Sequence, residues 1–288
     1  MSSPWVLSCD TGVDDALALG VAIAHPEFDM TAVVASAGNA ALDDVVANTS
    51  AVLGLLGWTG SFAVGDGLPI TGEVHGYAPY VHGADGLLGR RGTLLPGPPP
   101  APDGQSLIRG DVLATGPLTT VARAVAANAA IDRIVWMGGN LRAGNITKHA
   151  EFNAWWDPAA VDAVCTSGIP LRIVPLDLTQ QVRIQPDDVE RLRAGGPAAA
   201  FFGELEGESH QHSGKAALHD PVAVLATVEP ERFEWRRMAV RCDLDGETAG
   251  RTIATDDPSS SVEVAVGGDP DNLRQRIVEL LLSLDSSP

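Results

Sequence analysis

Three carboxylates lie within six residues near the N-terminus, in the run Asp10-Thr-Gly-Val-Asp14-Asp15. A short apolar run over residues 5–9 precedes them and a helical pattern over about 14–24 follows, so we predict a strand-to-helix turn. Helix capping explains a single Asp there, because a helix N-terminus favours negative charge. Three carboxylates repel one another unless a cation neutralises them. Since Ca²⁺ and Mg²⁺ prefer oxygen ligands, and the run holds no Cys or His, we expect a hard cation rather than zinc.

Two shorter motifs could complete such a site. Thr115 begins a Thr-Gly-Pro turn, and His219-Asp220-Pro opens an apolar helical stretch. On its own, each motif is explained by a turn or a helix cap. His82 lies in the turn-rich run VHGADGL. The run around His82 has low specificity on its own. His219 is a candidate for a general acid, and the alternative is that it is an ordinary surface residue.

The loop over residues 138–153 is rich in groups that hydrogen bond. It holds Asn145, Glu151 and Asn153 within nine residues, bounded by glycines and by Trp155 and Trp156. Such residues are commonly solvated when they lie in a loop. Together they suit a polyhydroxylated ligand such as a sugar, because each offers a donor or an acceptor to a hydroxyl group. The two tryptophans could stack on a ligand or belong to the core.

The elements that must position these groups alternate along the chain. Strand-like runs lie at 5–9, 31–36, 61–64, 111–115, 132–137 and 170–175, and helical patterns at about 14–24, 41–56, 118–128, 157–166, 187–193, 220–228 and 270–284. The alternation predicts a single α/β domain over 1–288, with a mostly parallel sheet flanked by helices. Residues 66–104 are expected to be loop-rich, and 234–266 to add two or three antiparallel strands. Ligands of such sheets bind at the carboxyl ends of the strands, where the polar segments begin.

Composition narrows the range of partners. The 288 residues include 37 Asp and Glu against 19 Lys and Arg, a formal net charge of −18. That charge repels phosphate backbones and anionic membranes, so we expect neither a nucleic-acid polymer nor a membrane as a partner. The sequence has no apolar run of about 18 residues that would predict a membrane span. Three separated cysteines and an N-terminus without a secretion signal favour the cytoplasm.

Several common enzyme motifs are missing from the sequence. It contains no GxGxxG at a strand-to-helix turn, no phosphate-binding GxxxxGK[ST] loop, no GxSxG nucleophile elbow and no HExxH zinc motif. Dinucleotide-dependent, ATP-dependent and serine-hydrolase functions therefore lose most of their support.

Seven segments, taken in order, resemble the calcium-dependent nucleoside hydrolases, the inosine-uridine-preferring nucleoside hydrolase family. They are DTGVDDALAL, SAGN, VHGADGL, ATGPLT, WMGGN, GNITKHAEFNAWWDP and LHDPVAV, and the resemblance runs from residue 6 to about residue 255. The resemblance implies a Rossmann-like fold, a Ca²⁺ cofactor and a homodimer or homotetramer. It also implies hydrolysis of the N-glycosidic bond of a ribonucleoside, giving ribose and a free nucleobase.

The resemblance further implies which residues bind the metal and activate water. The implied metal ligands are Asp10, Asp15, the backbone carbonyl of Thr115, and Asp220. Asp10 is also implied to be the general base.

Other positions match residues that bind the substrate. Asp14 and Asn153 resemble the groups that hold the ribose 2′-hydroxyl, and Asn145 and Glu151 those that hold the 5′-hydroxyl. The remaining implied contacts are Met137, which lines the pocket, Asn39 on the ribose side, and His219 and His82 near the nucleobase. Of the two histidines, His219 is the first candidate to protonate the departing base, because it adjoins Asp220.

Two residues depart from the family pattern DxDPGxDD. Ser8 stands where the first Asp is usual, and Thr11 stands where Pro is usual. Neither is an implied metal ligand, so we expect weaker calcium affinity rather than its loss.

Three other functions stay open at this point. One is the same chemistry on a modified nucleoside, and another is a non-catalytic nucleoside- or ribose-binding protein. The third is a phosphatase-like metal hydrolase that uses the Asp cluster. The preferred nucleobase is also open, because base contacts usually lie on loops, here expected at 72–90 and 198–218, where His210 and His212 are further candidates.

Overall fold

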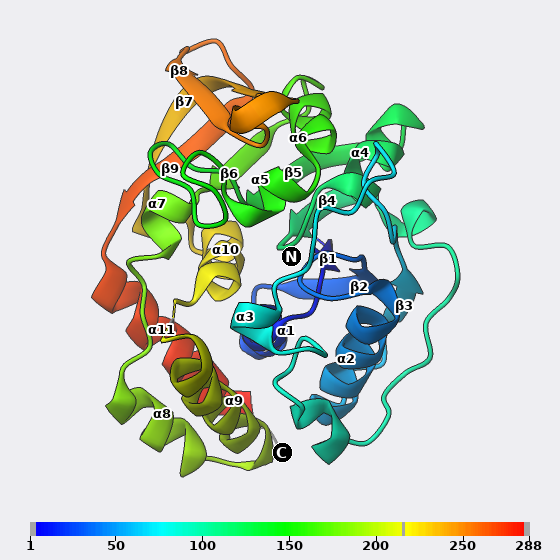
Figure 1. The fold of residues 1–288 in the computed structure, drawn as a ribbon. Coiled ribbons are helices and arrows are strands. Elements are labelled where there is room, and N and C mark those ends of the chain that lie inside the picture. The colour runs from blue at the N-terminus through cyan, green and yellow to red at the C-terminus, as the bar shows by residue number, and fades with distance from the viewer. Residues whose placement is uncertain (1–3, 215–216, 285–288) are drawn as a thin grey trace.

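A nine-stranded sheet runs through the computed structural model, which describes residues 4–214 and 217–284. The strand order is β3-β2-β1-β4-β5-β6-β9-β7-β8. Neighbours from β3 to β9 pair in parallel, whereas β7 pairs antiparallel with β9 and with β8. The predicted α/β architecture is therefore confirmed, including the antiparallel strands near the C-terminus (Figure 1).

The strands have these bounds: β1 Pro4–Cys9, β2 Asp29–Ala35, β3 Ser61–Val64, β4 Gly110–Ala114, β5 Ile131–Met137, β6 Leu171–Val174, β7 Phe233–Cys242, β8 Thr252–Asp256 and β9 Val262–Gly268. The α-helices are α1 Val13–Ala24, α2 Leu42–Leu55, α3 Pro79–His82, α4 Thr119–Ala126, α5 Phe152–Trp156, α6 Pro158–Cys165, α7 Leu176–Thr179, α8 Pro186–Arg193, α9 Pro197–Ser213, α10 His219–Val228 and α11 Pro270–Ser283. Short 3₁₀ turns lie at Arg90–Thr93, Gln105–Leu107, Pro230–Arg232 and Gly246–Thr248. In the described part of the chain, no helix is both long and apolar enough to span a bilayer.

The sheet is buried on both faces. Along β1, Trp5, Leu7 and Cys9 belong to one apolar cluster while Val6 belongs to the other. Helices α1, α10 and α11 pack together on the first side, and α4 and α6 pack together on the second. Burial on both faces explains why the central strands read as continuous apolar runs rather than as alternating ones.

The strand order reverses direction at β1. From β1 the chain adds β2 and β3 on one side of the sheet, and β4, β5 and β6 on the other. The carboxyl ends of β1 and β4 lie side by side there, because Ser8 pairs with Ala114. A reversal of this kind opens a crevice in which open α/β sheets bind their ligands.

The main departure from the sequence prediction is α9. The sequence predicts a loop over residues 198–218, but Pro197–Ser213 form a helix. Pro197 begins it, and Gly214 ends it in the left-handed conformation at φ 66°. Its glycines are present for packing: a Cβ on Gly203 or Gly207 would lie 2.7 Å or 2.3 Å from atoms of Arg193 in the neighbouring α8. Figure 1 shows α8, α9 and α11 gathered at the end of the molecule opposite β7 and β8.

Candidate active site

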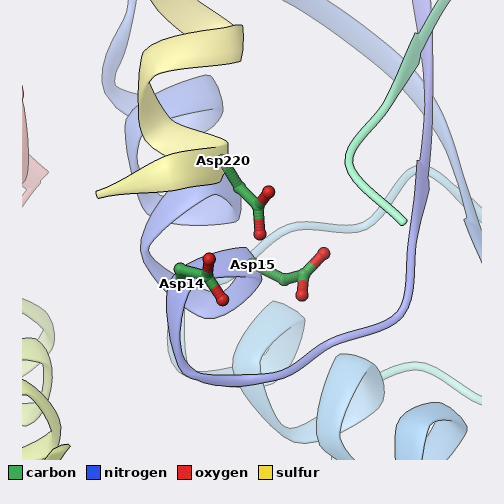
Figure 2. A group of neighbouring side chains, drawn as sticks. All are labelled: Asp14, Asp15 and Asp220. Carbon is green, nitrogen blue, oxygen red and sulfur yellow. The ribbon is translucent and has the colours of Figure 1, made fainter. Parts of the chain in front are cut away.

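Three carboxylates from two helices meet beyond the carboxyl end of β1. Asp14 and Asp15 lie in the first turn of α1, and Asp220 lies in the first turn of α10. One oxygen of each lies within 4.8 Å of the others. Figure 2 shows the three side chains turned toward a common space. The packing of α1 against α10 therefore brings the last predicted metal ligand to the N-terminal cluster.

Asp15 is held by four hydrogen bonds. Its Oδ1 accepts from the Thr115 hydroxyl at 2.8 Å and from the backbone N–H of Asp10 at 3.3 Å. Its Oδ2 accepts from the Gly12 N–H at 3.0 Å and from Asn39 Nδ2 at 3.1 Å. These bonds come from the segments that follow β1, β2 and β4, so the buried carboxylate joins three loops at one point.

Asp10 lies beside this carboxylate, and within the described chain only one of its two carboxylate oxygens accepts a hydrogen bond. Oδ2 accepts from the Asn39 N–H at 2.7 Å, whereas Oδ1 is buried and has no hydrogen-bond partner among the described residues. Two glycines make room for the carboxylate. A Cβ on Gly38 would lie 2.1 Å from Oδ2, and a Cβ on Gly116 would lie 2.4 Å from Oδ1. The glycines of the SAGN and TGP motifs are therefore required by the close approach of Asp10.

The cluster gathers several carboxyl groups, and their pKa values are raised. Burial and the charge of Asp15 raise the pKa of Asp10 well above its usual range. Burial and the charges of Asp14 and Asp15 do the same to the pKa of Asp220, and burial raises the pKa of Asp14 to about 7. Among the described residues that line the adjoining cavity, none is Lys or Arg. Buried carboxylates in such surroundings need an opposite charge.

A divalent cation fits this cluster. Asp14 Oδ1 is buried without a hydrogen-bond partner in the described chain, as is Asp10 Oδ1. The donors are carboxylates with neighbouring backbone carbonyls, which are the ligands that hard cations prefer. Asp10, one of the predicted ligands, is not among the three carboxylates that converge within 4.8 Å, and Asp14 takes that place.

A cavity opens above the carboxylates. All of the predicted site residues line it except Asp10 and Asp15, which are buried beneath it. The lining residues are Val13, Asp14, Asn39, Ala78, Tyr80, Val81, His82, Thr115, Met137, Asn145, Glu151, Phe152, Asn153, Glu206, Ser209, Ala217, His219 and Asp220. Residues from separate parts of the chain thus share one site.

The loop that follows β5 forms one wall of the cavity. Asn153 Nδ2 donates to the carbonyls of Thr115 and Met137, at 2.8 Å and 3.1 Å. The Glu151 carboxylate caps α5 and accepts from the backbone N–H groups of Gly139, Asn153 and Ala154. Despite these bonds, burial raises the pKa of Glu151 to about 7. Hydrogen bonds to the backbone therefore fix the orientation of Asn153 and Glu151 in this wall.

The two histidines come from different helices. His82 ends α3, and its Nδ1 accepts a hydrogen bond of 3.0 Å from the Val13 N–H. Because Nδ1 is the acceptor, the neutral ring carries its proton on Nε2. His219 begins α10, and its Nδ1 lies 2.8 Å from the Thr179 hydroxyl. Each ring is therefore oriented through Nδ1.

The comparison with known proteins decides the family. A family model described as inosine-uridine preferring nucleoside hydrolase matches residues 5–275. This chain belongs to the inosine-uridine preferring nucleoside hydrolase family. Its reaction is the hydrolysis of the N-glycosidic bond of a ribonucleoside. The predicted resemblance is confirmed, and it extends beyond residue 255.

Relatives of this nucleoside hydrolase differ in the base that their names specify. The pyrimidine-specific ribonucleoside hydrolase RihA of Photobacterium profundum is 35% identical, over 98% of each chain. The solved purine-preferring ribonucleoside hydrolase from Gardnerella vaginalis superposes with a TM-score of 0.89 at 27% identity, over 98% of each chain. The plant nucleoside hydrolase PpNRh1 gives a TM-score of 0.87 at 27% identity, over 100% of each chain.

Sequence reasoning missed one side of the nucleoside hydrolase cavity. Glu206 and Ser209 line it from α9, and Tyr80 and Val81 line it from α3. The glycines and short polar residues of α9 read as a loop, so no helical face could be assigned to Glu206. In α3 and α9, the sequence pointed only to histidines as candidate site residues.

Other candidates lie away from the cavity. Neither His210 nor His212 is among its described lining residues, and His212 Nε2 instead lies 3.0 Å from the Pro79 carbonyl oxygen. Trp156 is buried in an apolar cluster with Phe152, as the core alternative predicted. Trp155 packs against the His75 ring, with ring centroids 5.3 Å apart.

Proposed function

We propose that this nucleoside hydrolase acts on pyrimidine ribonucleosides and releases ribose and the free pyrimidine. The observation that carries the proposal is the meeting of Asp14, Asp15 and Asp220 at the base of a cavity walled by amides and carboxylates. The pyrimidine preference rests on the named specificity of the relative that is 35% identical over 98% of the chain.

We propose Ca²⁺ as the cofactor, held by Asp10, Asp15, the Thr115 carbonyl and Asp220. The convergence of carboxylates supports this set, with Asp14 beside it. The Thr115 carbonyl accepts a bond from Asn153 and has a second lone pair for a cation. When bound, Ca²⁺ would supply positive charge that makes a nearby water more acidic and orients the ribose hydroxyls.

Asp10 is proposed as the general base. Its Oδ2 is anchored to the Asn39 N–H, and its buried Oδ1 has no partner in the described chain. Oδ1 of Asp10 could therefore accept the proton of a water that lies beside the anomeric carbon. Proton transfer to a positioned carboxylate contributes about 10²–10⁴-fold to a rate.

The ribose is proposed to bind between α1 and the loop after β5. Asp14 offers Oδ1, and Asn153 offers its side-chain oxygen, to the 2′-hydroxyl, because Asn153 Nδ2 already donates to two carbonyls. Asn145 and Glu151 face the 5′-hydroxyl from the same wall, while Asn39 and Met137 complete the ribose contacts. Positive charge builds on the ribosyl ring as the glycosidic bond breaks. The surrounding carboxylates stabilise that charge.

The nucleobase is proposed to lie between α3 and α10, in contact with His82 and His219. Both histidines line the cavity. In each ring Nδ1 contacts a neighbouring protein group, so Nε2 is the nitrogen proposed to face the base. We also propose that the protein forms a homodimer or homotetramer, as the family resemblance implies, and light scattering after size exclusion would measure this.

Product analysis on purine and pyrimidine ribonucleosides tests the function. We expect free base and ribose from uridine or cytidine in the presence of Ca²⁺, and neither product after chelation or in Asp10→Ala. Release of purine bases alone would overturn the pyrimidine assignment. Bound nucleoside without any product would instead indicate the binding-protein alternative. Activity that survives chelation would overturn the role of Ca²⁺.

A further inference from the structure

Glu206 is a buried carboxyl group that the proposed reaction leaves unused. It lies on α9, is 2% exposed and lines the cavity. In the part of the chain that the structure describes, its carboxyl group makes no hydrogen bond. Glu151, which lines the same cavity, accepts three backbone N–H bonds by contrast. Glu206 can therefore act on a ligand without giving up a hydrogen bond of the described fold, whereas Glu151 is already held by three.

The surroundings of Glu206 favour its neutral form. The ionisable side chains that line the same cavity are Asp14, Tyr80, His82, Glu151, His219 and Asp220, and no described lining residue is Lys or Arg. Burial, together with the charge of Asp14, raises the pKa of Glu206 to about 8. A neutral carboxyl group differs from a carboxylate in having an O–H to donate.

Helix α9, which carries Glu206, packs against α3, one of the two helices proposed to border the nucleobase. His212 of α9 lies 3.0 Å from the Pro79 carbonyl oxygen at the start of α3. Arg90, which follows α3, pairs with Glu204 and Glu208 of α9. These contacts hold α9 against α3, and Glu206 lines the same cavity as Tyr80 and His82 of α3. The proposed ribose residues come from α1, against which α9 also packs, and from the loop after β5.

We propose that Glu206 is a catalytic residue that protonates the departing nucleobase, an inference that rests on the proposed function. As the bond between C1′ and N1 of a pyrimidine breaks, its electron pair moves onto the ring and increases charge at O2. The Glu206 O–H gives its proton to the base, which leaves as a neutral molecule. Water adds to C1′ and loses a proton to Asp10. Exchange with solvent then returns a proton to Glu206 and removes one from Asp10, so the cycle balances.

Two substrates with different leaving groups test this role. Uridine needs a proton on its leaving base, whereas p-nitrophenyl ribofuranoside releases a stable anion and needs none. In Glu206→Gln, we expect kcat for uridine to fall about 10²-fold or more, the usual contribution of a general acid. We expect kcat for p-nitrophenyl ribofuranoside to stay within a few-fold of wild type. Gln keeps a donor and an acceptor but has no acidic proton, so it separates proton transfer from recognition.

Each outcome is decisive. Unchanged turnover of uridine in Glu206→Gln would overturn the proposal, and so would an equal loss on both substrates. Glu206→Asp provides a second comparison if Gln impairs folding: it keeps an acidic proton and should retain more uridine turnover than Gln, relative to p-nitrophenyl ribofuranoside. The proposal would be contradicted if the ratio of kcat for uridine to kcat for p-nitrophenyl ribofuranoside were the same in Glu206→Asp and Glu206→Gln. Glu279→Gln, which removes an exposed carboxylate from α11, is the matched control.

Failure of the proposed function would look different. Wild-type protein would then release neither base nor p-nitrophenol from any riboside. Wild-type protein that hydrolyses both ribosides, with no selective defect in Glu206→Gln, would sustain the proposed function and overturn only the role of Glu206.

Discussion

The backbone N–H of Asn39 donates a hydrogen bond of 2.7 Å to Oδ2 of Asp10. That bond fixes the carboxylate while its Oδ1, also buried, has no partner among the described residues. Gly38 and Gly116 enclose the same carboxylate so closely that a Cβ at either position would collide with it. One oxygen is thus used for orientation while the other has no partner in the described chain, the arrangement that the proposed role of Asp10 as general base needs.

Asp10→Asn should lower kcat for a ribonucleoside by about 10²–10⁴-fold, because the amide cannot accept the proton of water. The measurement is kcat with Ca²⁺ saturating, with bound calcium determined on the same sample. Asp29→Asn, at an exposed position in β2, is the control for removal of one negative charge. Retention of full turnover by Asp10→Asn would exclude Asp10 as the base.

Uridine should be hydrolysed far better than 2′-deoxyuridine. Loss of the 2′-hydroxyl leaves Asp14 Oδ1 and the Asn153 amide without their proposed ligand, and buried polar sites reject such analogues by about 10⁴–10⁵-fold. The quantity to compare is kcat/KM for the two nucleosides under the same conditions. Equal values would show that the 2′-hydroxyl does not lie at Asp14 and Asn153.

Calcium should stabilise the folded protein. The ion would neutralise carboxylates beside a cavity whose described lining holds no Lys or Arg, so adding Ca²⁺ to chelated protein should raise Tm. At a free concentration 100 times Kd the expected stabilisation is about 2.7 kcal/mol. Asp220→Asn should shift the calcium dependence of Tm to higher concentration, because it removes a ligand from the cluster. An unchanged dependence would contradict this ligand assignment.

In the chelated protein, the free energy of unfolding should fall as pH rises between about 4.5 and 8. Burial raises the pKa of Glu151 to about 7 and that of Glu206 to about 8, from an ordinary value of 4.5. Over that range the folded state binds more protons than the unfolded state, so rising pH favours unfolding. Urea unfolding across this range measures the slope. Glu206→Gln should make the slope shallower, and an identical slope would show that Glu206 ionises normally.

Much of the fold and part of the acidic cluster could be predicted from local pattern. The apolar run of β1, the following Asp-Thr-Gly and the helical spacing after Asp14 predicted the strand, the turn and the helix that the structure contains. Thr115, His219 and Asp220 could be added only through the resemblance to a family, since each motif alone is explained by a turn or a cap. The structure shows the physical basis: β4 adjoins β1, and α10 packs on α1.

The sequence by itself determined the local elements, because strand and helix periods and turn residues act over a few neighbouring positions. The same local pattern placed the carboxylates of Asp10, Asp14 and Asp15 together at the end of one strand. Only the tertiary structure decided that Glu206 lies in the same cavity. Gly203 and Gly207 allow α9 to pack closely on α8, and that packing sets which face of α9 meets α1 and α3. Contacts between segments far apart in the chain depend on such packing, and no local pattern encodes them.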